Sequence, residues 1–355
     1  MFASANCTFI PPSIPSDAGI AGAGVLLSST ITATLALLLS LSLILTSAST
    51  SPTSNNKNPS VLRRKLLNGY SDQQIIVGIG IQSVGLVKAT TLVPYHFFLI
   101  WLLSLLSTAT HNAALLALVH DFRRDRILRS MRQALMLVSL ALSTVYGIFI
   151  LRAKTERIPA TVAIACAFVG IPEGEKTGQQ AGGIEYVGTV ATMAGNCVVF
   201  GLATWYLQSR KQRWYRVVQW VGLVLMAAVA IGMSLSLSLS LSLSLSVFHF
   251  FFFFFPTSRS IYSWLGMLMI MPLGATTRAY LLSQAFGTPD VQLSDEGEKS
   301  WSFGQLLSML MLFLPVVSVI EIMRGEVAVA PPVDDSDDEG QMLVGQPVVT
   351  KSGKY

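Results

Sequence analysis

Long apolar stretches recur along the chain and are separated by shorter polar segments. A helix needs about 20 apolar residues to cross the hydrocarbon layer of a membrane. The strongest stretches are Val25–Leu45, Ile75–Val93, Phe97–Val119, Ala134–Leu151, Tyr186–Leu207 and Leu306–Ile320. This pattern predicts an all-α fold, a polytopic transmembrane helix bundle, with Pro315 bending the last helix.

The number of crossings depends on a low-complexity tract. Residues 234–255 read SLSLSLSLSLSLSVFHFFFFFF. A CT repeat and a T-rich run would encode this pattern, and such pyrimidine runs precede splice acceptors. Our hypothesis is that residues 234–258 are a translated intron; the alternative is a genuine low-complexity span. Without the tract, Val217–Met233 and Ile261–Leu282 supply one crossing and an interfacial segment, because Arg278 is costly at the bilayer centre. About seven crossings result, with eight as the alternative.

Composition supports a membrane location. Charged residues make up 12% of the chain, against about 25% in an ordinary globular protein. So few charges cannot cover a soluble protein of 355 residues, and the surface must therefore contact the lipid bilayer. The net charge of +5 does not indicate a nucleic-acid partner, because the basic residues lie in short segments between the spans.

The distribution of Lys and Arg predicts the topology. The segments after the first, third and fifth spans are richest in basic residues and are expected in the cytoplasm. These segments are Lys57–Lys65, Arg123–Arg132 and Arg210–Arg216. Residues 1–24 are then extracellular or lumenal, and residues 25–323 form the bundle. Residues 324–355 form a disordered acidic tail, which seven crossings place in the cytoplasm.

Candidate sites of covalent modification lie near both ends of the chain and near its middle. Cys7 and Cys166 fall on the outer side in this topology, where thiols can form a disulfide; the alternative is two unpaired cysteines. Asn6 begins the sequence Asn-Cys-Thr, a glycosylation acceptor motif on the same side. Ser336 lies among acidic residues and suits an acid-directed kinase; the alternative is an unmodified, solvated tail.

The third predicted span carries the candidate ligand-binding residues. His111 and Asn112 lie near its middle, and an ionisable residue at membrane depth is a functional candidate by default. Thr108 shares their helix face at three- and four-residue spacing, and lipid cannot satisfy such a face. We expect these side chains to point inward and bind a ligand; the alternative is interhelical hydrogen bonding, worth about 0.6 kcal/mol per pair. His96 lies about 22 Å away along the helix axis, too far to share a metal ion with His111.

Other polar residues receive local interpretations. Ser71 or Asp72 is expected to cap the second span. Lys88, near the outer end of that span, is expected to extend its ammonium group to the membrane surface. Ile158–Gly170 is apolar but too short to cross, and we expect it to lie on the bundle or at the membrane interface.

Several sequence blocks resemble a large group of uncharacterised multi-span integral membrane proteins of filamentous fungi. The matching pieces are Cys7, DAGIAGAGV (Asp17–Val25), YSDQQIIVGIGI (Tyr70–Ile81), YHFFLIWLLSLLSTATHNAALLAL (Tyr95–Leu118) and WSFGQLLSMLMLFLP (Trp301–Pro315). The chain departs from the group after the first block, where Leu26, Leu27 and Ser28 replace an Arg with aromatic residues. The resemblance implies a membrane location and about seven spans, and it implies no activity.

The motifs favour a non-enzymatic function. The last span contains no Lys for a retinal Schiff base, and the chain has no HExxH helix, so no catalytic residue, metal ion or cofactor is expected. A receptor- or sensor-like heptahelical protein is the favoured function, in the plasma membrane or an endomembrane, with the basic loops available to a cytoplasmic protein partner. The alternative is a transporter or channel subunit for a small molecule, which the lack of a detectable internal repeat weakens.

Overall fold

The predicted spans are helices in the computed structural model, which describes residues 5–49, 58–118, 126–171, 176, 178, 183–208, 274–289 and 291–324. The described part of the chain is all-α and has no strand; an isolated β-bridge joins Ile14 to Leu293. Its helices are α1 (Ala18–Ala21), α2 (Ala23–Ser49), α3 (Asn58–Val87), α4 (Pro94–Ala117), α6 (Arg126–Thr155), α7 (Cys166–Val169), α8 (Gly183–Gln208), α12 (Phe303–Leu310), the 3₁₀ turn η3 (Met311–Phe313) and α13 (Leu314–Met323). Residues 274–282 are also helical.

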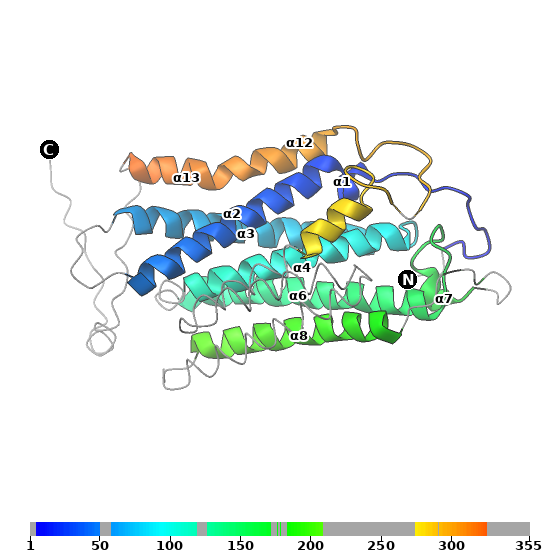
Figure 1. Ribbon diagram of the computed structural model, residues 1–355, viewed down its shortest axis with the longest axis horizontal. Coiled ribbons are helices and arrows are strands. Elements are labelled where there is room, and N and C mark those ends of the chain that lie inside the picture. The colour runs from blue at the N-terminus through cyan, green and yellow to red at the C-terminus, as the bar shows by residue number, and fades with distance from the viewer. Residues whose placement is uncertain are drawn as a thin grey trace, which may run out of the picture.

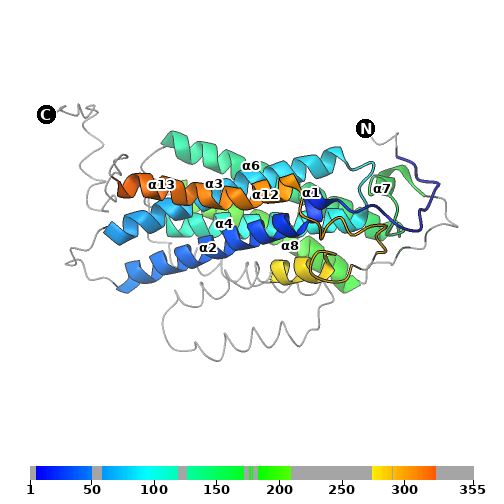
Figure 2. The ribbon, with the colours of Figure 1, turned by 90° about the horizontal axis from the view of Figure 1, so that it is seen from above.

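The long helices lie side by side along the longest dimension of the molecule (Figure 1). α4 packs against α2, α3 and α6. In the most apolar stretch of α4, 94% of the residues are buried inside the protein. In the corresponding stretch of Phe303–Met323, 11% are buried. α4 is therefore the central helix, whereas α12 and α13 form an outer helix that passes along α2 and α3 (Figure 2).

Within the described ranges, four helical segments are long and apolar enough to cross a membrane. They are Ala18–Leu43, Pro94–Leu115, Arg129–Thr155 and Phe303–Met323. They coincide with the predicted first, third, fourth and last spans, while the second and fifth predicted spans lie in α3 and α8. The length and composition of the four segments are those of a membrane protein.

Aromatic side chains of α4 and α6 fill the centre of the bundle. The Phe97 ring lies 4.6 Å from the ring of Tyr146 and 5.4 Å from that of Phe149, measured between ring centroids. The Tyr146 hydroxyl donates to the backbone carbonyl of Gln82 at 2.7 Å. Because a buried tyrosine hydroxyl needs a partner, this bond fixes α6 against α3.

The break predicted at Pro315 takes the form of the 3₁₀ turn η3, which ends just before α13. Proline has no backbone N–H to continue the α-helical ladder. The ring of Pro315 also lies close to α3, because a Cβ built on Gly69 would be only 2.8 Å from Pro315 Cβ. Glycine at position 69 thus lets the outer helix approach α3.

The prediction that Ser71 or Asp72 caps the second span is wrong, because both residues lie inside α3, which begins at Asn58. Leu67 and Tyr70 are buried against the bundle and extend the helix beyond the apolar stretch. Asp72 instead forms a salt bridge with Arg132 of α6, whose guanidinium also donates to Asn68 at 3.2 Å.

Lys88 directly follows α3 and has a specific partner in the N-terminal segment. Its ammonium group lies 2.7 Å from a carboxylate oxygen of Asp17, just before α1. The Lys88 side chain is 46% exposed and that of Asp17 is 19% exposed, so the pair contributes modestly to stability. Its effect is to place the N-terminal segment against the end of α3.

Some sequence predictions lie outside the described residues. These are the Val217–Met233 stretch, the tract 234–258, residues 261–273, the basic segment Arg210–Arg216, and Ser336 with residues 325–355 of the acidic tail.

Candidate functional site

Three chain segments cover one end of the bundle and are here called the cap. The cap comprises residues 5–22, 158–171, and 283–302 without residue 290. Figure 1 shows α1 and α7 at the same end of the long helices, and residues 283–302 lead into α12 there.

A disulfide ties two of the cap segments together. Cys7 and Cys166, the cysteines expected on one side of the membrane, are bonded, and their Cα atoms are 5.6 Å apart. Cys166 begins α7 and is buried. Asn6, beside the disulfide, is exposed, and its side-chain oxygen accepts hydrogen bonds from Thr8 N–H at 3.3 Å and Thr8 O–H at 3.0 Å.

The second cap segment packs on the turn between α3 and α4. The backbone N–H of Ile164 donates to Leu92 O at 2.8 Å, and that of Ala165 donates to Ala89 O at 3.1 Å. The side chains of Ile158 and Ile164 are buried. The apolar stretch Ile158–Gly170 therefore lies on the bundle, which is one of the two placements predicted from the sequence.

A buried carboxylate fastens the third cap segment to α4. Glu298 Oε2 accepts a hydrogen bond from the Tyr95 hydroxyl at 2.8 Å, and Glu298 Oε1 lies 3.0 Å from His96 Nε2. The Glu298 side chain has no exposed surface and that of His96 is 3% exposed. The Tyr95 hydroxyl also accepts from the backbone N–H of Gln284 at 3.1 Å. Burying a carboxylate is costly unless it is paired and hydrogen-bonded. Tyr95 and His96 supply these contacts to Glu298.

The first and third segments are joined directly. Ile14 N–H donates to Gln292 O at 3.2 Å, and Ser294 N–H donates to Ile14 O at 2.8 Å. The backbone N–H of Ala23, at the start of α2, donates to Glu298 O at 3.1 Å. Glu298 is thus held through both its side chain and its backbone.

The side chain of Gln305 in α12 bonds the start of α2 and the end of the third cap segment. Its side-chain oxygen accepts from Gly24 N–H at 2.9 Å, and its side-chain nitrogen donates to Ser300 O at 2.9 Å. A Cβ built on Gly24 would lie 2.6 Å from Gln305 Cβ. The glycine in the DAGIAGAGV block therefore permits a backbone approach that any side chain would prevent.

Three of the sequence blocks contribute residues to the contacts around Glu298 and Gln305. Asp17–Val25, Tyr95–Leu118 and Trp301–Pro315 meet at this end of the bundle through Gly24, His96 and Gln305. Sequence reasoning found the blocks but missed Glu298, because it lies outside them in an acidic segment with no local pattern.

The candidate residues at membrane depth are buried in α4. Thr108, His111 and Asn112 have 6%, 3% and 4% of their surfaces exposed, as expected for an inward-facing group. The Thr108 hydroxyl donates to Ser104 O of its own helix at 2.9 Å. His111 Nε2 lies 3.0 Å from the Ser107 hydroxyl, which donates to the backbone carbonyl of Gln74 at 3.1 Å.

These contacts indicate which ring nitrogen of His111 carries the proton. A serine hydroxyl has one proton, and Ser107 uses it on the carbonyl of Gln74 in α3. Ser107 must therefore accept from His111, which places the His111 proton on Nε2 and leaves Nδ1 as an acceptor. Among the described residues, His111 Nδ1 has no hydrogen-bond partner, and an unpaired buried polar atom costs about 1–3 kcal/mol.

The described residues contain no group of three or more His, Cys, Asp or Glu side chains placed to hold a metal ion. No family model, curated protein or solved structure matches the chain.

Proposed function

We propose that the chain is a non-enzymatic, receptor- or sensor-like heptahelical membrane protein whose cap receives the stimulus. The observation that carries this proposal is the buried contact of Glu298 with Tyr95 and His96. The contact attaches the cap to the first turn of α4, the most buried of the four apolar segments. A change in the cap would therefore act on the helix that packs against α2, α3 and α6.

The proposed topology places the cap outside the cell or in the lumen of an endomembrane. The Cys7–Cys166 disulfide supports this side, because disulfides persist in oxidising compartments. α6 ends at Thr155, beside the cap, so Arg129 and Arg132 at its other end face the cytoplasm. A cytoplasmic protein partner would bind these basic residues, and a total of seven crossings would put residues 324–355 on the same side.

The alternative is a transporter or channel subunit for a small molecule. Among the described residues, His111 lies 3.0 Å from the Ser107 hydroxyl, which donates to the backbone of α3. These polar groups of α4 thus form contacts within and between helices, and this supports the sensor.

Gene disruption combined with rescue tests the proposal. Transcript responses to nutrients and stresses would be compared with the uptake of labelled solutes in cells with and without the gene. Glu298→Gln is the test variant. Glu296→Gln is the matched control, because Glu296 is 75% exposed and pairs only with nearby Lys299 among the described residues. We expect the control but not the test variant to restore the response, at equal amounts in the membrane and with unchanged uptake. Solute transport by the purified protein in lipid vesicles would overturn the proposal.

A further inference from the structure

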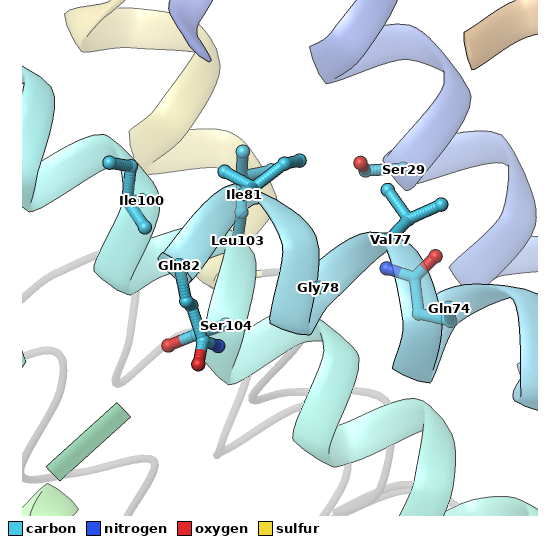
Figure 3. A pocket seen from close by; sticks show the side chains of 9 residues that line it. All are labelled: Ser29, Gln74, Val77, Gly78, Ile81, Gln82, Ile100, Leu103 and Ser104. Carbon is cyan, nitrogen blue, oxygen red and sulfur yellow. The ribbon is translucent and has the colours of Figure 1, made fainter. Parts of the chain in front are cut away.

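Polar side chains surround a small cavity between α2, α3 and α4. Ser29 of α2, Gln74 and Gln82 of α3, and Ser104 of α4 contribute to its lining, together with apolar side chains such as Leu103. Figure 3 shows Gln82 and Ser104 at one end of the group and Ser29 and Gln74 at the other. None of the lining residues carries a charge.

The side-chain amide of Gln82 is the first indication of a ligand. Gln82 is only 1% exposed, and neither its Nε2 nor its Oε1 has a hydrogen-bond partner within the described part of the protein. The backbone beside this amide is fixed, because the backbone carbonyl of Gln82 accepts the 2.7 Å hydrogen bond from Tyr146 of α6. An amide that can donate two and accept two hydrogen bonds is thus held beside the cavity.

Ser104 supplies a second polar group. Its hydroxyl donates to Trp101 O at 2.7 Å, so in the 2.8 Å contact between the Ser104 and Ser143 hydroxyls the proton belongs to Ser143. A hydroxyl oxygen has two acceptor lone pairs, and Ser143 occupies one of them. The second lone pair of Ser104 can therefore accept another hydrogen bond.

We propose that this cavity is a binding site for one water molecule, which bridges the Gln82 amide to the Ser104 hydroxyl. A buried water needs about 10–15 Å³ and two to four polar partners; the cavity offers about 10 Å³, and Gln82 and Ser104 supply the partners. A larger ligand does not fit. An ion is disfavoured because no opposite charge lines the site.

The water completes a hydrogen-bonded connection across three helices. It joins α3 to α4 through Gln82 and Ser104, and the Ser104–Ser143 contact continues to α6. Hydrocarbon offers no hydrogen bonds, so polar groups at this depth must be satisfied within the protein. The bound water accordingly fixes the positions of α3, α4 and α6 relative to one another.

A structure of the purified full-length protein in lipid, at a resolution that reveals ordered water, tests this site. We expect density within hydrogen-bonding distance of both the Gln82 amide and Ser104 Oγ. A dry cavity would overturn the proposal, and so would a Gln82 side chain that turns to bond another protein group. This measurement uses the unaltered chain, so it does not depend on the folding of any variant.

Two variants test the assigned partners. Gln82→Met keeps the length of the side chain but removes its hydrogen-bonding groups, and we expect the water density to disappear. Ser40→Ala is the control, because the buried Ser40 hydroxyl donates to Ala36 O of its own helix at 2.8 Å, away from the cavity; its water density should be unchanged. Water that stays in place in Gln82→Met would refute the role of Gln82.

Discussion

Glu298 and His96 are 202 residues apart in the chain, yet Glu298 Oε1 lies 3.0 Å from His96 Nε2, in a contact closed to solvent. Tyr95 binds the other carboxylate oxygen. Two adjacent residues at the start of α4 thus hold one carboxylate from the segment that precedes α12, and this contact fixes the outer helix to the central one.

Removal of the carboxylate should be strongly destabilising. In Glu298→Ala, Tyr95 and His96 would lose a buried partner, and we expect the free energy of unfolding to fall by about 2–5 kcal/mol. Chemical unfolding of the purified protein in detergent measures the change. Glu296→Ala, two residues away and exposed, should change it by about 0.5 kcal/mol or less. Equal effects of the two variants would contradict the assigned role of Glu298.

Loss of the disulfide should loosen the cap. Cys7 and Cys166 close a loop over a sequence separation of 159 residues, and we expect Cys7→Ser to lower the free energy of unfolding by about 2–5 kcal/mol. Cys197→Ser is the control, because Cys197 is free and exposed. Peptide mapping without reductant should recover a linked pair containing Cys7 and Cys166. Two unlinked peptides would argue against both the bond and the outer location of the cap.

Glycine positions with different surroundings should respond oppositely to alanine. At Gly24 the added Cβ would lie 2.6 Å from Gln305 Cβ, so Gly24→Ala should destabilise the protein by about 1–3 kcal/mol through overpacking. At Gly80, inside α3, nothing lies within 4 Å of the added Cβ, and Gly80→Ala should stabilise the helix by about 0.5–1 kcal/mol. Thermal unfolding of both variants checks the signs. A stabilising effect at Gly24 would show that Gln305 does not pack there.

Substitution of His111 separates a ligand-binding role from a packing role. His111→Leu leaves the Ser107–Gln74 hydrogen bond intact, so stability should fall by about 1 kcal/mol or less. If His111 binds a ligand, the variant should reach the membrane normally but fail to restore the response in disrupted cells. If His111 only packs helices, as its contact with Ser107 favours, the response should be restored. Thr110→Val is the control, because the Thr110 hydroxyl bonds only Leu106 O of its own helix among the described contacts. Full rescue by His111→Leu would remove His111 from the ligand site.

Hydropathy predicted the long helices because the lipid layer imposes both their length and their composition. The stretch Phe97–Val119 corresponds closely to α4, whereas Ala134–Leu151 lies inside the longer helix α6, Arg126–Thr155. The start of α3 could not be predicted in this way. Its first residues are polar, and a helix continues beyond the lipid wherever residues such as Leu67 find buried neighbours.

The polar contacts of the cap were largely beyond prediction from local sequence. Lys88 meets Asp17 at a separation of 71 residues, and neither residue has a neighbouring pattern that identifies the other. Asp295, Glu296 and Glu298 lie in one short acidic segment, and their local sequence does not distinguish them. Of the three, Glu298 alone is fully buried. By contrast, the inward direction of His111 followed from helical spacing and from the inability of lipid to satisfy polar groups.

The attachment of Glu298 also bears on gene structure. Residues 283–302 are held by α4 and by the N-terminal segment, so the starting point of the helix at Phe303 does not depend on the length of chain that precedes them. A transcript that lacked the codons for residues 234–258 would encode the same cap and the same Phe303–Met323 helix. Transcripts with and without these codons would therefore encode proteins with the same cap.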